Sequence, residues 1–222
     1  MVETLRLTPD EALTLLVERA AALTERVDGR VALGIAGGPG VGKSTLAARL
    51  VERLNAAHPG EAALVPMDGF HIRHAELEAM GQTDRKGAPH TFEAAAFVDF
   101  LGRLKRSMEP MTGPGYSRKI EDVVDDAFTV APSVRVLVVE GNYLLLESTE
   151  WAGVRPLLEF AAFLEVPREL VRARLLARHG AEGLFTPERN IAHVERNDLP
   201  NYDLVMATAG RADVAIALKV PQ

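Results

Sequence analysis

The sequence predicts an α/β fold, a Rossmann-like three-layer sandwich in which a mostly parallel sheet is covered by helices on both faces. Short, near-continuously apolar runs recur along the chain, as in the interior strands of a parallel sheet. Segments with helical periodicity fall between these runs. A glycine-rich loop directly follows the first apolar run, which is typical of α/β folds that bind phosphate groups at their strand ends.

The predicted elements follow in chain order. Residues 9–27 repeat apolar side chains every three or four positions behind Thr8 and Pro9, which predicts an amphipathic helix that ends at Gly29. A strand over 31–36 leads through glycines into a long helix over 43–57. Further helices are predicted over 92–107 and 168–179, and further strands over 62–67, 134–139, 160–166 and 203–207.

Two regions break the alternation of strands and helices. The first, residues 69–91, is rich in His, Arg, Lys and Gly, and the second, residues 110–129, reads as a loop plus a β-hairpin. Ligands of open α/β sheets bind beyond the carboxyl ends of the strands, so we expect both insertions to handle the substrate there. Because no internal repeat or low-complexity linker interrupts the chain, a single domain over 1–222 is predicted.

The composition limits the classes of function. The chain has 222 residues and a net charge of -6, which argues against nucleic-acid binding and against an anionic membrane surface. It contains no cysteine, so disulfides, thiolate metal sites and cysteine nucleophiles are excluded. The N-terminal residues carry acids among their apolar positions, unlike a secretory signal, and no apolar run approaches about 20 residues. A soluble, cytoplasmic protein is expected.

The glycine-rich loop carries the strongest signal. The segment GGPGVGKS matches the phosphate-loop pattern GxxxxGKS through Gly37, Gly42, Lys43 and Ser44, with a strand before it and a helix after it. Glycines let backbone N–H groups turn toward phosphate oxygens, the lysine reaches the outer phosphates, and the serine hydroxyl is offered to Mg²⁺. The predicted nucleotide-binding residues are Gly37, Gly38, Pro39, Gly40, Val41, Gly42, Lys43, Ser44 and Thr45.

Two acids stand where apolar strands stop. Asp68 follows the second strand and Glu140 ends the third, so both are expected in the crevice beside the phosphate loop. Asp68 is predicted to be the base that takes the proton of an acceptor hydroxyl, although an Asp-Gly turn explains it structurally. Glu140 is predicted to act near Mg²⁺ and the substrate, the alternative being a capping or solvated acid.

Six motifs occur in an order that resembles a known family: GGPGVGKST, MDGFH, PHTFE, GYSRKIEDV, VVEGNYLLL and NDLPN. Over residues 32–205 the chain is similar to the uridine kinase, pantothenate kinase and phosphoribulokinase group of P-loop kinases, and most similar to its small bacterial branch of nucleoside/nucleotide kinase-like or fructose-transport-system kinases. The resemblance implies ATP and Mg²⁺ as cofactors, Asp68 as the base, and Glu140 near the metal and substrate.

The resemblance also implies a lid, over residues 179–190, whose arginines approach the nucleotide phosphates. The stretch VRARLLARHG matches it through Arg174 and Arg178, and less closely through Arg172. Such an arginine neutralises charge on the transferred phosphoryl group, so Arg174 is a predicted catalytic residue and Arg178 a predicted nucleotide-binding residue. Without the resemblance, arginines on a helix favour a solvated face.

Polar residues of the two insertions are the predicted substrate side. His71, His90, Tyr116 and Arg118, together with Glu140, are expected to contact the acceptor, and Arg73 and Lys86 add basic charge nearby. For His71 a surface histidine without a ligand is an equal alternative. Phe92 and Glu93 are expected to begin a helix, with Phe92 buried. The pair His71 and His74 has little zinc character, because further ligands do not follow at a suitable spacing.

The predicted reaction is transfer of the ATP γ-phosphoryl group to a hydroxyl of a sugar-like, nucleoside-like or pantothenate-like molecule. MDGFH departs from uridine kinases, and the long additional segments of pantothenate kinase are missing, so uridine or pantothenate kinase proper remains an alternative. A nucleotide-dependent regulatory switch without an acceptor is the alternative from another class, although RNDLPN lacks the lysine of a guanine-reading segment. A small-molecule acceptor is the expected partner, without nucleic acid or membrane, and a homodimer is left open.

Overall fold

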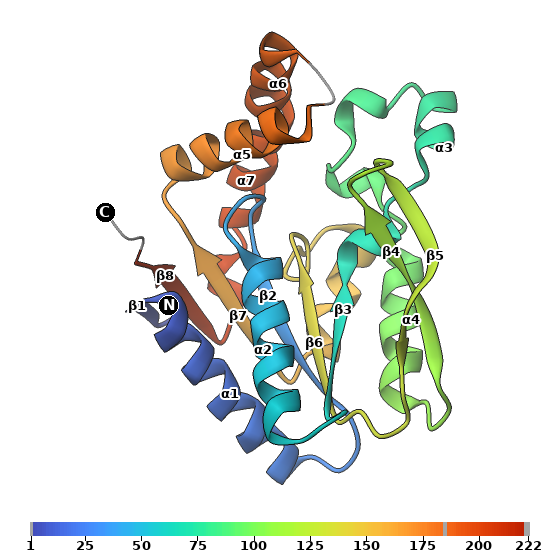
Figure 1. Cartoon of the computed structure of the whole chain (residues 1–222), viewed down its shortest axis with the longest axis vertical. Coiled ribbons are helices and arrows are strands. Elements are labelled where there is room, and N and C mark those ends of the chain that lie inside the picture. Colours follow the sequence, from blue (N-terminus) through green and yellow to red (C-terminus); the bar gives the residue numbers. More distant parts are fainter. Residues whose placement is uncertain (1, 184–185, 220–222) are drawn as a thin grey trace.

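The chain folds around a six-stranded, fully parallel sheet in the computed structural model, which describes residues 2–183 and 186–219 (Figure 1). Neighbouring strands across the sheet are ordered β1-β8-β7-β2-β6-β3. The central strands match the predicted apolar runs closely, which confirms the α/β fold class. The strand bounds are β1 Thr4–Leu7, β2 Val31–Gly37, β3 Ala62–Pro66, β6 Val136–Gly141, β7 Phe160–Glu165 and β8 Val214–Leu218.

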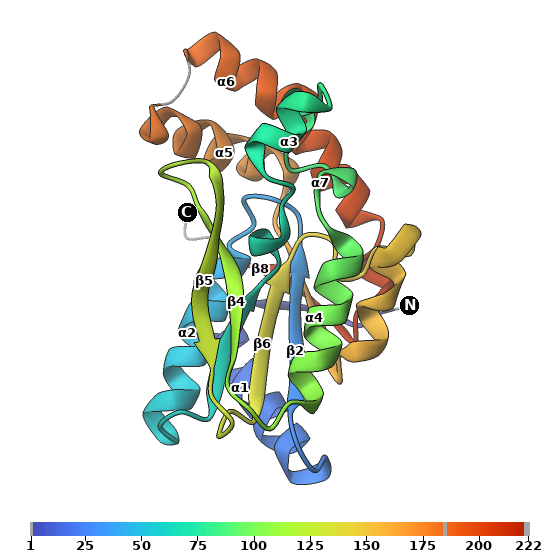
Figure 2. The ribbon, with the colours of Figure 1, turned by 90° about the vertical axis from the view of Figure 1, so that its right-hand side faces the viewer.

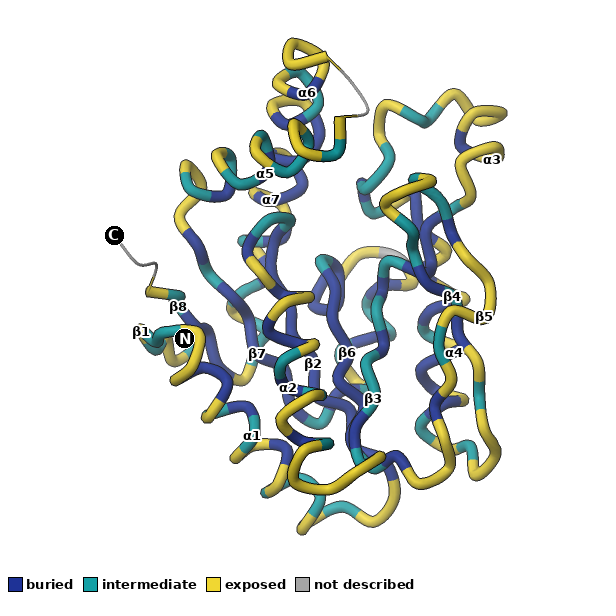
Figure 3. The backbone as a smooth tube through the Cα atoms, viewed as in Figure 1, coloured by how far each residue is buried: buried dark blue, intermediate teal, exposed yellow. Residues whose placement is uncertain are grey.

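The sheet divides the interior into two cores, which explains why its strands are apolar without alternation. Along β2, Leu33 and Ile35 pack into one core, whereas Ala32 and Ala36 pack into the other. Every residue of β2 and β6 is buried, as the dark strands of Figure 3 show. A strand covered on both faces has no solvent side on which polar residues are favoured.

Helices cover both faces of the sheet. The first core holds side chains of α1 (Pro9–Arg26), α2 (Lys43–Ala57) and α5 (Arg168–Glu182), and the second holds those of α4 (Ala94–Arg106). Figure 2 shows α2 and α4 on opposite sides of β6. The predicted first helix is confirmed: Thr8 caps it, and the side chain of Glu11 accepts a hydrogen bond from the Thr8 backbone N–H.

The first insertion lies beyond the carboxyl edge of the sheet, as predicted, whereas the second runs alongside α4 and only its turn reaches that edge (Figures 1 and 2). The first contains the short helix α3 (His74–Ala79), and the second forms an antiparallel hairpin of β4 (Met111–Ser117) and β5 (Asp122–Val130). Across a gap in Figure 1 lie α5, α6 (Pro187–His193) and α7 (Leu199–Met206). The proposed lid, residues 179–190, includes residues 184 and 185, which lie outside the described residues.

One predicted strand is wrong. Residues 203–206 belong to α7 and Ala207 caps it. The helix continues from a π-helix over Val194–Asp198 and has Pro200 in its first turn, a position where the missing N–H costs little. The edge of the sheet is built instead by β8 and β1, neither of which was predicted. Phe92 is buried, as expected, but the predicted helix begins two residues later than expected, at Ala94, with Glu93 immediately before it. None of the helices within the described residues is both long and apolar enough to span a membrane.

Candidate active site

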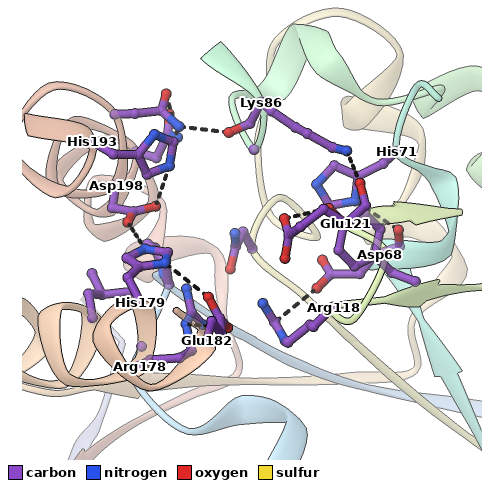
Figure 4. Close-up of a pocket in the computed structure, with 18 of the residues that line it drawn as sticks. Asp68, His71, Lys86, Arg118, Glu121, Arg178, His179, Glu182, His193 and Asp198 are labelled. Carbon is purple, nitrogen blue, oxygen red and sulfur yellow. Dashed lines mark hydrogen bonds and ion pairs between the residues drawn. The ribbon is translucent and has the colours of Figure 1, made fainter. Parts of the chain in front are cut away.

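A pocket of about 660 Å³ opens between the insertions and the α5–α7 segment. Its floor is the phosphate loop, where Pro39, Gly40 and residues 42–45 line it, and the ends of β3 and β6 add Asp68 and Glu140. Figure 4 shows its two walls, one carrying Asp68, His71 and Arg118 and the other carrying Arg178 and His179. Residues from five separate segments of the sequence therefore meet in one cavity, because the carboxyl ends of parallel strands share one edge of the sheet.

The phosphate loop has the backbone that its glycines predict. Gly40 and Gly42 have φ values of 73° and 100°, in the left-handed region that favours glycine, and α2 begins immediately afterwards at Lys43. The N-terminus of α2 therefore faces the pocket with unpaired N–H groups, a geometry suited to an anion. Not every loop residue faces the cavity: Gly37 and Gly38 do not line it, and the Val41 side chain is buried in the core.

The ammonium group of Lys43 is buried at the base of the pocket. Its Nζ donates hydrogen bonds to the Gly38 carbonyl, at 2.9 Å, and to the Asn142 side-chain oxygen, at 2.6 Å. Burial lowers the pKa of Lys43, whereas the negative charges of Glu140 and Asp68 raise it. A positive charge that is desolvated and held by only two neutral oxygens is prepared to bind phosphate.

Glu140 is a buried carboxylate, with 4% of its surface exposed. Burial, and then repulsion from Asp68, raise the pKa of Glu140 to about 7, while Lys43 and a hydrogen bond from Ser44 act in the opposite direction. Ser44 and Glu140 thus place a hydroxyl and a carboxylate oxygen side by side. Such a set of oxygen donors suits a hard cation such as Mg²⁺.

Asp68 lies in the single-turn 3₁₀ segment Met67–Phe70 directly after β3. Its side chain lines the pocket and forms an ion pair with Arg118 from the β4–β5 hairpin, with 3.7 Å between Oδ2 and NH2. The next residue, Gly69, explains how the hairpin comes so close, since a Cβ at that position would overlap the backbone carbonyl of Pro114 in β4. The hairpin is thereby packed directly against the strand end that carries Asp68.

The hairpin and the first insertion build one wall of the pocket. The Tyr116 hydroxyl donates to the Glu121 carboxylate at 3.0 Å, and Lys86 lies over the Tyr116 ring at 5.2 Å while donating to the Glu121 carbonyl. Burial, and then the charge of Glu121, raise the pKa of Tyr116, so the phenol stays protonated as a donor.

His71 is buried between aromatic neighbours and lines the same cavity. Its ring centroid lies 3.8 Å from that of Phe92 and 4.6 Å from that of Tyr116, and its Nδ1 lies 2.8 Å from the carbonyl oxygen of Asp68. Because a carbonyl only accepts, Nδ1 carries the proton of the neutral ring. Burial lowers the pKa of His71, so the neutral form is favoured and Nε2 remains an acceptor.

The predicted lid arginines divide into two groups. Arg174 reaches the phosphate loop, 3.3 Å from the Gly40 carbonyl, and Arg178 lines the pocket with its buried Nε atom lacking a hydrogen bond. Burial, and then repulsion from Arg118, lower the pKa of Arg178. Arg172 instead points away and pairs with Glu195 at 2.6 Å.

Some predicted substrate residues are not brought to the pocket. His90 is exposed, lies 3.3 Å from the Gln82 side chain, and lines a separate cavity next to Trp151. Its place in the 3₁₀ turn Pro89–Thr91 turns the side chain away from Asp68. Arg73 forms an exposed ion pair with Asp125. His71, Tyr116, Arg118 and Lys86 do line the pocket.

Sequence reasoning missed several pocket residues. Asn142 accepts a hydrogen bond from Lys43. It stands two positions after Glu140 at the end of the same strand, and this position could have predicted that it reaches the pocket. Glu121 reaches the pocket because the hairpin turn places it at a φ of 51°. A cluster of His179, His193 and Asp198 also lines the pocket, and it forms through helix packing and a π-helix that the sequence pattern does not predict.

Comparisons with known proteins relate the chain to small-molecule kinases. A scan of protein-family models finds no match. A Schizosaccharomyces pombe protein named "Putative uridine kinase" is 35% identical over 208 residues, covering 90% of this chain and 88% of the relative. The pantothenate kinase of Latilactobacillus sakei is 32% identical over 148 residues, covering 66% of this chain and 48% of that enzyme.

A solved structure supports the same grouping. The "putative fructose transport system kinase" from Silicibacter sp. TM1040 superposes with a TM-score of 0.80 at 35% identity, covering 90% of this chain and 98% of that one. The chain has a phosphate loop, strand-end acids and the fold of these relatives. It is therefore an ATP-dependent small-molecule kinase that belongs to the uridine kinase, pantothenate kinase and phosphoribulokinase group of P-loop kinases.

Proposed function

We propose that this chain transfers the γ-phosphoryl group of ATP to a hydroxyl of a small, non-aromatic, hydroxyl-rich acceptor, sugar-like or pantothenate-like. The observation that carries the proposal is the convergence of three charged groups. Lys43 of the phosphate loop lies close enough to Asp68 and Glu140, which end neighbouring segments of the sheet, for both acids to raise its pKa. Phosphate binding and hydroxyl activation thereby fall within one cavity.

The phosphates are held by the loop and the lid arginines. Lys43 and the N–H groups at the start of α2 bind the outer phosphates, and Arg174 and Arg178 approach them from the opposite wall. Arg178 supports this assignment because its buried Nε has no hydrogen-bond partner. Two guanidinium groups neutralise charge on the phosphoryl group and exclude water that would hydrolyse ATP.

Mg²⁺ fits the residues beside the loop. A buried carboxylate such as Glu140 is costly without a cation, and the Ser44 hydroxyl already contacts it. When bound, Mg²⁺ neutralises phosphate charge and orients the nucleotide. Ser44 and Glu140 would hold it, directly or through water.

Asp68 performs the proton transfer. The acceptor hydroxyl gives its proton to the Asp68 carboxylate as its oxygen bonds to the γ-phosphorus and the bond to the ADP oxygen breaks. The Arg118 ion pair holds the carboxylate at the entrance of the acceptor side. Because Asp68 follows β3 directly, the sheet fixes its position relative to the phosphate loop.

The acceptor side favours a molecule without an aromatic base. Among the described residues, the phenylalanine and tyrosine rings that line the pocket are Phe92 and Tyr116. His71 packs against both rings, and Lys86 also covers Tyr116. A nucleobase would need a free ring face for stacking, whereas a polyol needs polar atoms. His71 Nε2, Glu121 and Lys86 supply an acceptor, a carboxylate and a cation.

The test is ADP release by the purified chain with Mg²⁺ and ATP, measured against sugars, sugar acids, pantothenate and nucleosides. A sugar-like or pantothenate-like compound is expected to give the highest turnover. Asp68→Asn should lower kcat by about 10²- to 10⁴-fold while ATP binding persists. Asp125→Asn is the matched control, because Asp125 forms an exposed ion pair away from the pocket.

Each alternative has its own outcome. Highest turnover with nucleosides would reject the acceptor class while leaving the kinase intact. ATP hydrolysis that no acceptor stimulates would favour a nucleotide switch. Normal phosphorylation of an acceptor by Asp68→Asn would remove Asp68 from the role of base.

A further inference from the structure

We propose that His179, His193 and Asp198 form a binding site for a zinc-like divalent transition-metal ion on the lid-side wall of the pocket, separate from the Mg²⁺ position at the phosphate loop. The three residues come from the end of α5, the end of α6 and the π-helix. One ligand atom from each lies within 4.8 Å of the others. Figure 4 shows them gathered on the wall opposite His71 and Lys86.

The two oxygens of Asp198 each face one imidazole. Oδ2 lies 2.9 Å from Nε2 of His179, and Oδ1 lies 3.9 Å from Nε2 of His193. The two imidazole rings are perpendicular, with centroids 5.5 Å apart. Their ring nitrogens therefore converge on the carboxylate from different directions, as ligands around one ion do.

The contacts of His179 leave room for an ion at its Nε2 atom. His179 has carboxylates at both ring nitrogens, with Glu182 at 3.2 Å from Nδ1 and Asp198 at 2.9 Å from Nε2. Without an ion, a protonated imidazole donates to both carboxylates, whereas a neutral imidazole carries one N–H and donates to only one of them. An ion on Nε2 would satisfy Asp198 while Nδ1 donates to Glu182. A carboxylate behind a ligating histidine is the usual way in which the ring of a metal ligand is oriented.

The π-helix explains how His193 and Asp198 meet. They are five residues apart, and with 3.6 residues per turn an α-helix would separate them to different faces. Within Val194–Asp198 the backbone bonds span five residues, including the bond from the Leu199 N–H to the Val194 carbonyl, so residues five apart lie along one side. This local irregularity brings Asp198 beneath His193.

The donor set identifies the class of ion. Two imidazoles and a carboxylate suit Zn²⁺ and related first-row ions, whereas Mg²⁺ prefers oxygen. Three protein ligands leave coordination positions open. Because all three residues line the pocket, those positions face the cavity and can take water or an oxygen atom of a bound molecule.

The test is Zn²⁺ titration of the full chain, freed of metal with a chelator, by calorimetry in the presence of excess Mg²⁺. One ion per chain is expected. His193→Gln should weaken Zn²⁺ binding by at least about tenfold, and Glu182→Gln by about tenfold through the orientation of His179. His58→Gln is the matched control, since His58 ends α2 far from the pocket lining, and its affinity should be unchanged.

Two further outcomes decide the proposal. His193 is 33% exposed, so its variant should keep the wild-type melting temperature. If the His193→Gln variant unfolds instead, the wild-type protein loaded with Co²⁺ is measured by NMR. Two paramagnetically shifted imidazole N–H proton signals would show that two histidines bind the ion. Equal Zn²⁺ affinity in wild type and a folded His193→Gln, loss of binding in Glu140→Gln instead, or a Co²⁺ spectrum without imidazole signals would overturn the site.

Discussion

The Lys43 ammonium group and the Asn142 side chain are hydrogen-bonded to each other, with 2.6 Å between Nζ and Oδ1. Lys43 stands at the end of the phosphate loop that follows β2, and Asn142 stands directly after β6. The bond therefore connects the ends of two strands that are neighbours in the sheet but distant in the sequence. An amide oxygen binds the ammonium without neutralising it. The bond therefore positions Lys43 at the base of the pocket without adding a negative charge beside it.

Removal of that amide should weaken nucleotide binding. In Asn142→Ala, Lys43 loses one of two hydrogen bonds, and we expect ATP affinity to fall by about tenfold, equivalent to about 1.4 kcal/mol. In Asn142→Asp, a carboxylate would compete with phosphate for the lysine, so the loss should be larger. Fluorescent-nucleotide titration measures both. Affinity in Asn142→Asp equal to or above that of Asn142→Ala would contradict this role.

The central strands could be predicted because burial on both faces leaves a continuous apolar run, and the acids at their ends could be predicted because parallel strands share a carboxyl edge. The strand predicted over residues 203–207 was wrong for a related reason. A short apolar run does not distinguish a strand from a buried helix, and Val205 is buried by α7 packing against the sheet.

The rest of the site depends on tertiary contacts that spacing does not encode. Asp198 meets His179 only because α6 folds back onto α5, and it meets His193 only because the helix is locally a π-helix. His90 stood in a motif shared with the family, yet a single 3₁₀ turn separates it from the pocket. The positions of Asp198 and His90 depend on local backbone geometry that the sequence pattern does not reveal, whereas the glycines of the phosphate loop directly predict its backbone conformation.

Glu140 should make the unliganded protein less stable as the pH rises. Its pKa is raised to about 7 in the folded state, above its ordinary value of 4.5, so between these values the folded state binds more protons than the unfolded state. Folding stability therefore falls as the pH increases through this window. Glu140→Gln removes the effect, and its advantage in melting temperature over wild type should be larger at pH 8 than at pH 5.

The comparison for Glu140 is made by thermal unfolding without nucleotide, followed by the same measurement with Mg²⁺ and ATP. A cation near Glu140 offsets its burial, so ligand should stabilise wild type more than the variant. A melting-temperature difference that is constant with pH would show that the carboxylate is not the source.

Gly69 should tolerate no side chain. A Cβ there would overlap the Pro114 carbonyl, which is backbone and cannot rotate away, so Gly69→Ala must push the hairpin outward. We expect a loss of about 1 to 3 kcal/mol in the free energy of unfolding, together with lower activity because Arg118 moves away from Asp68. Gly210→Ala is the control, since open space surrounds that position. Denaturant unfolding that does not separate the two variants would contradict the close packing.

Arg178 and Arg172 provide a matched pair on one helix. Arg178 lines the pocket, where its Nε is buried without a hydrogen bond and Glu182 is 3.8 Å away, whereas Arg172 is hydrogen-bonded to Glu195 outside it. We expect Arg178→Gln to weaken ATP binding by about tenfold or more, because the substitution removes a guanidinium group whose buried Nε has no hydrogen bond in the absence of a phosphate. The same change at Arg172 should leave ATP affinity within about twofold. The Arg178 Nε atom lacks a hydrogen bond, its ion pair with Glu182 is long at 3.8 Å, and Arg118 repels it, so Arg178→Gln should melt no lower than wild type. Nucleotide titration and thermal unfolding of both variants check this, and a drop in melting temperature with unchanged ATP affinity would make Arg178 a structural residue instead.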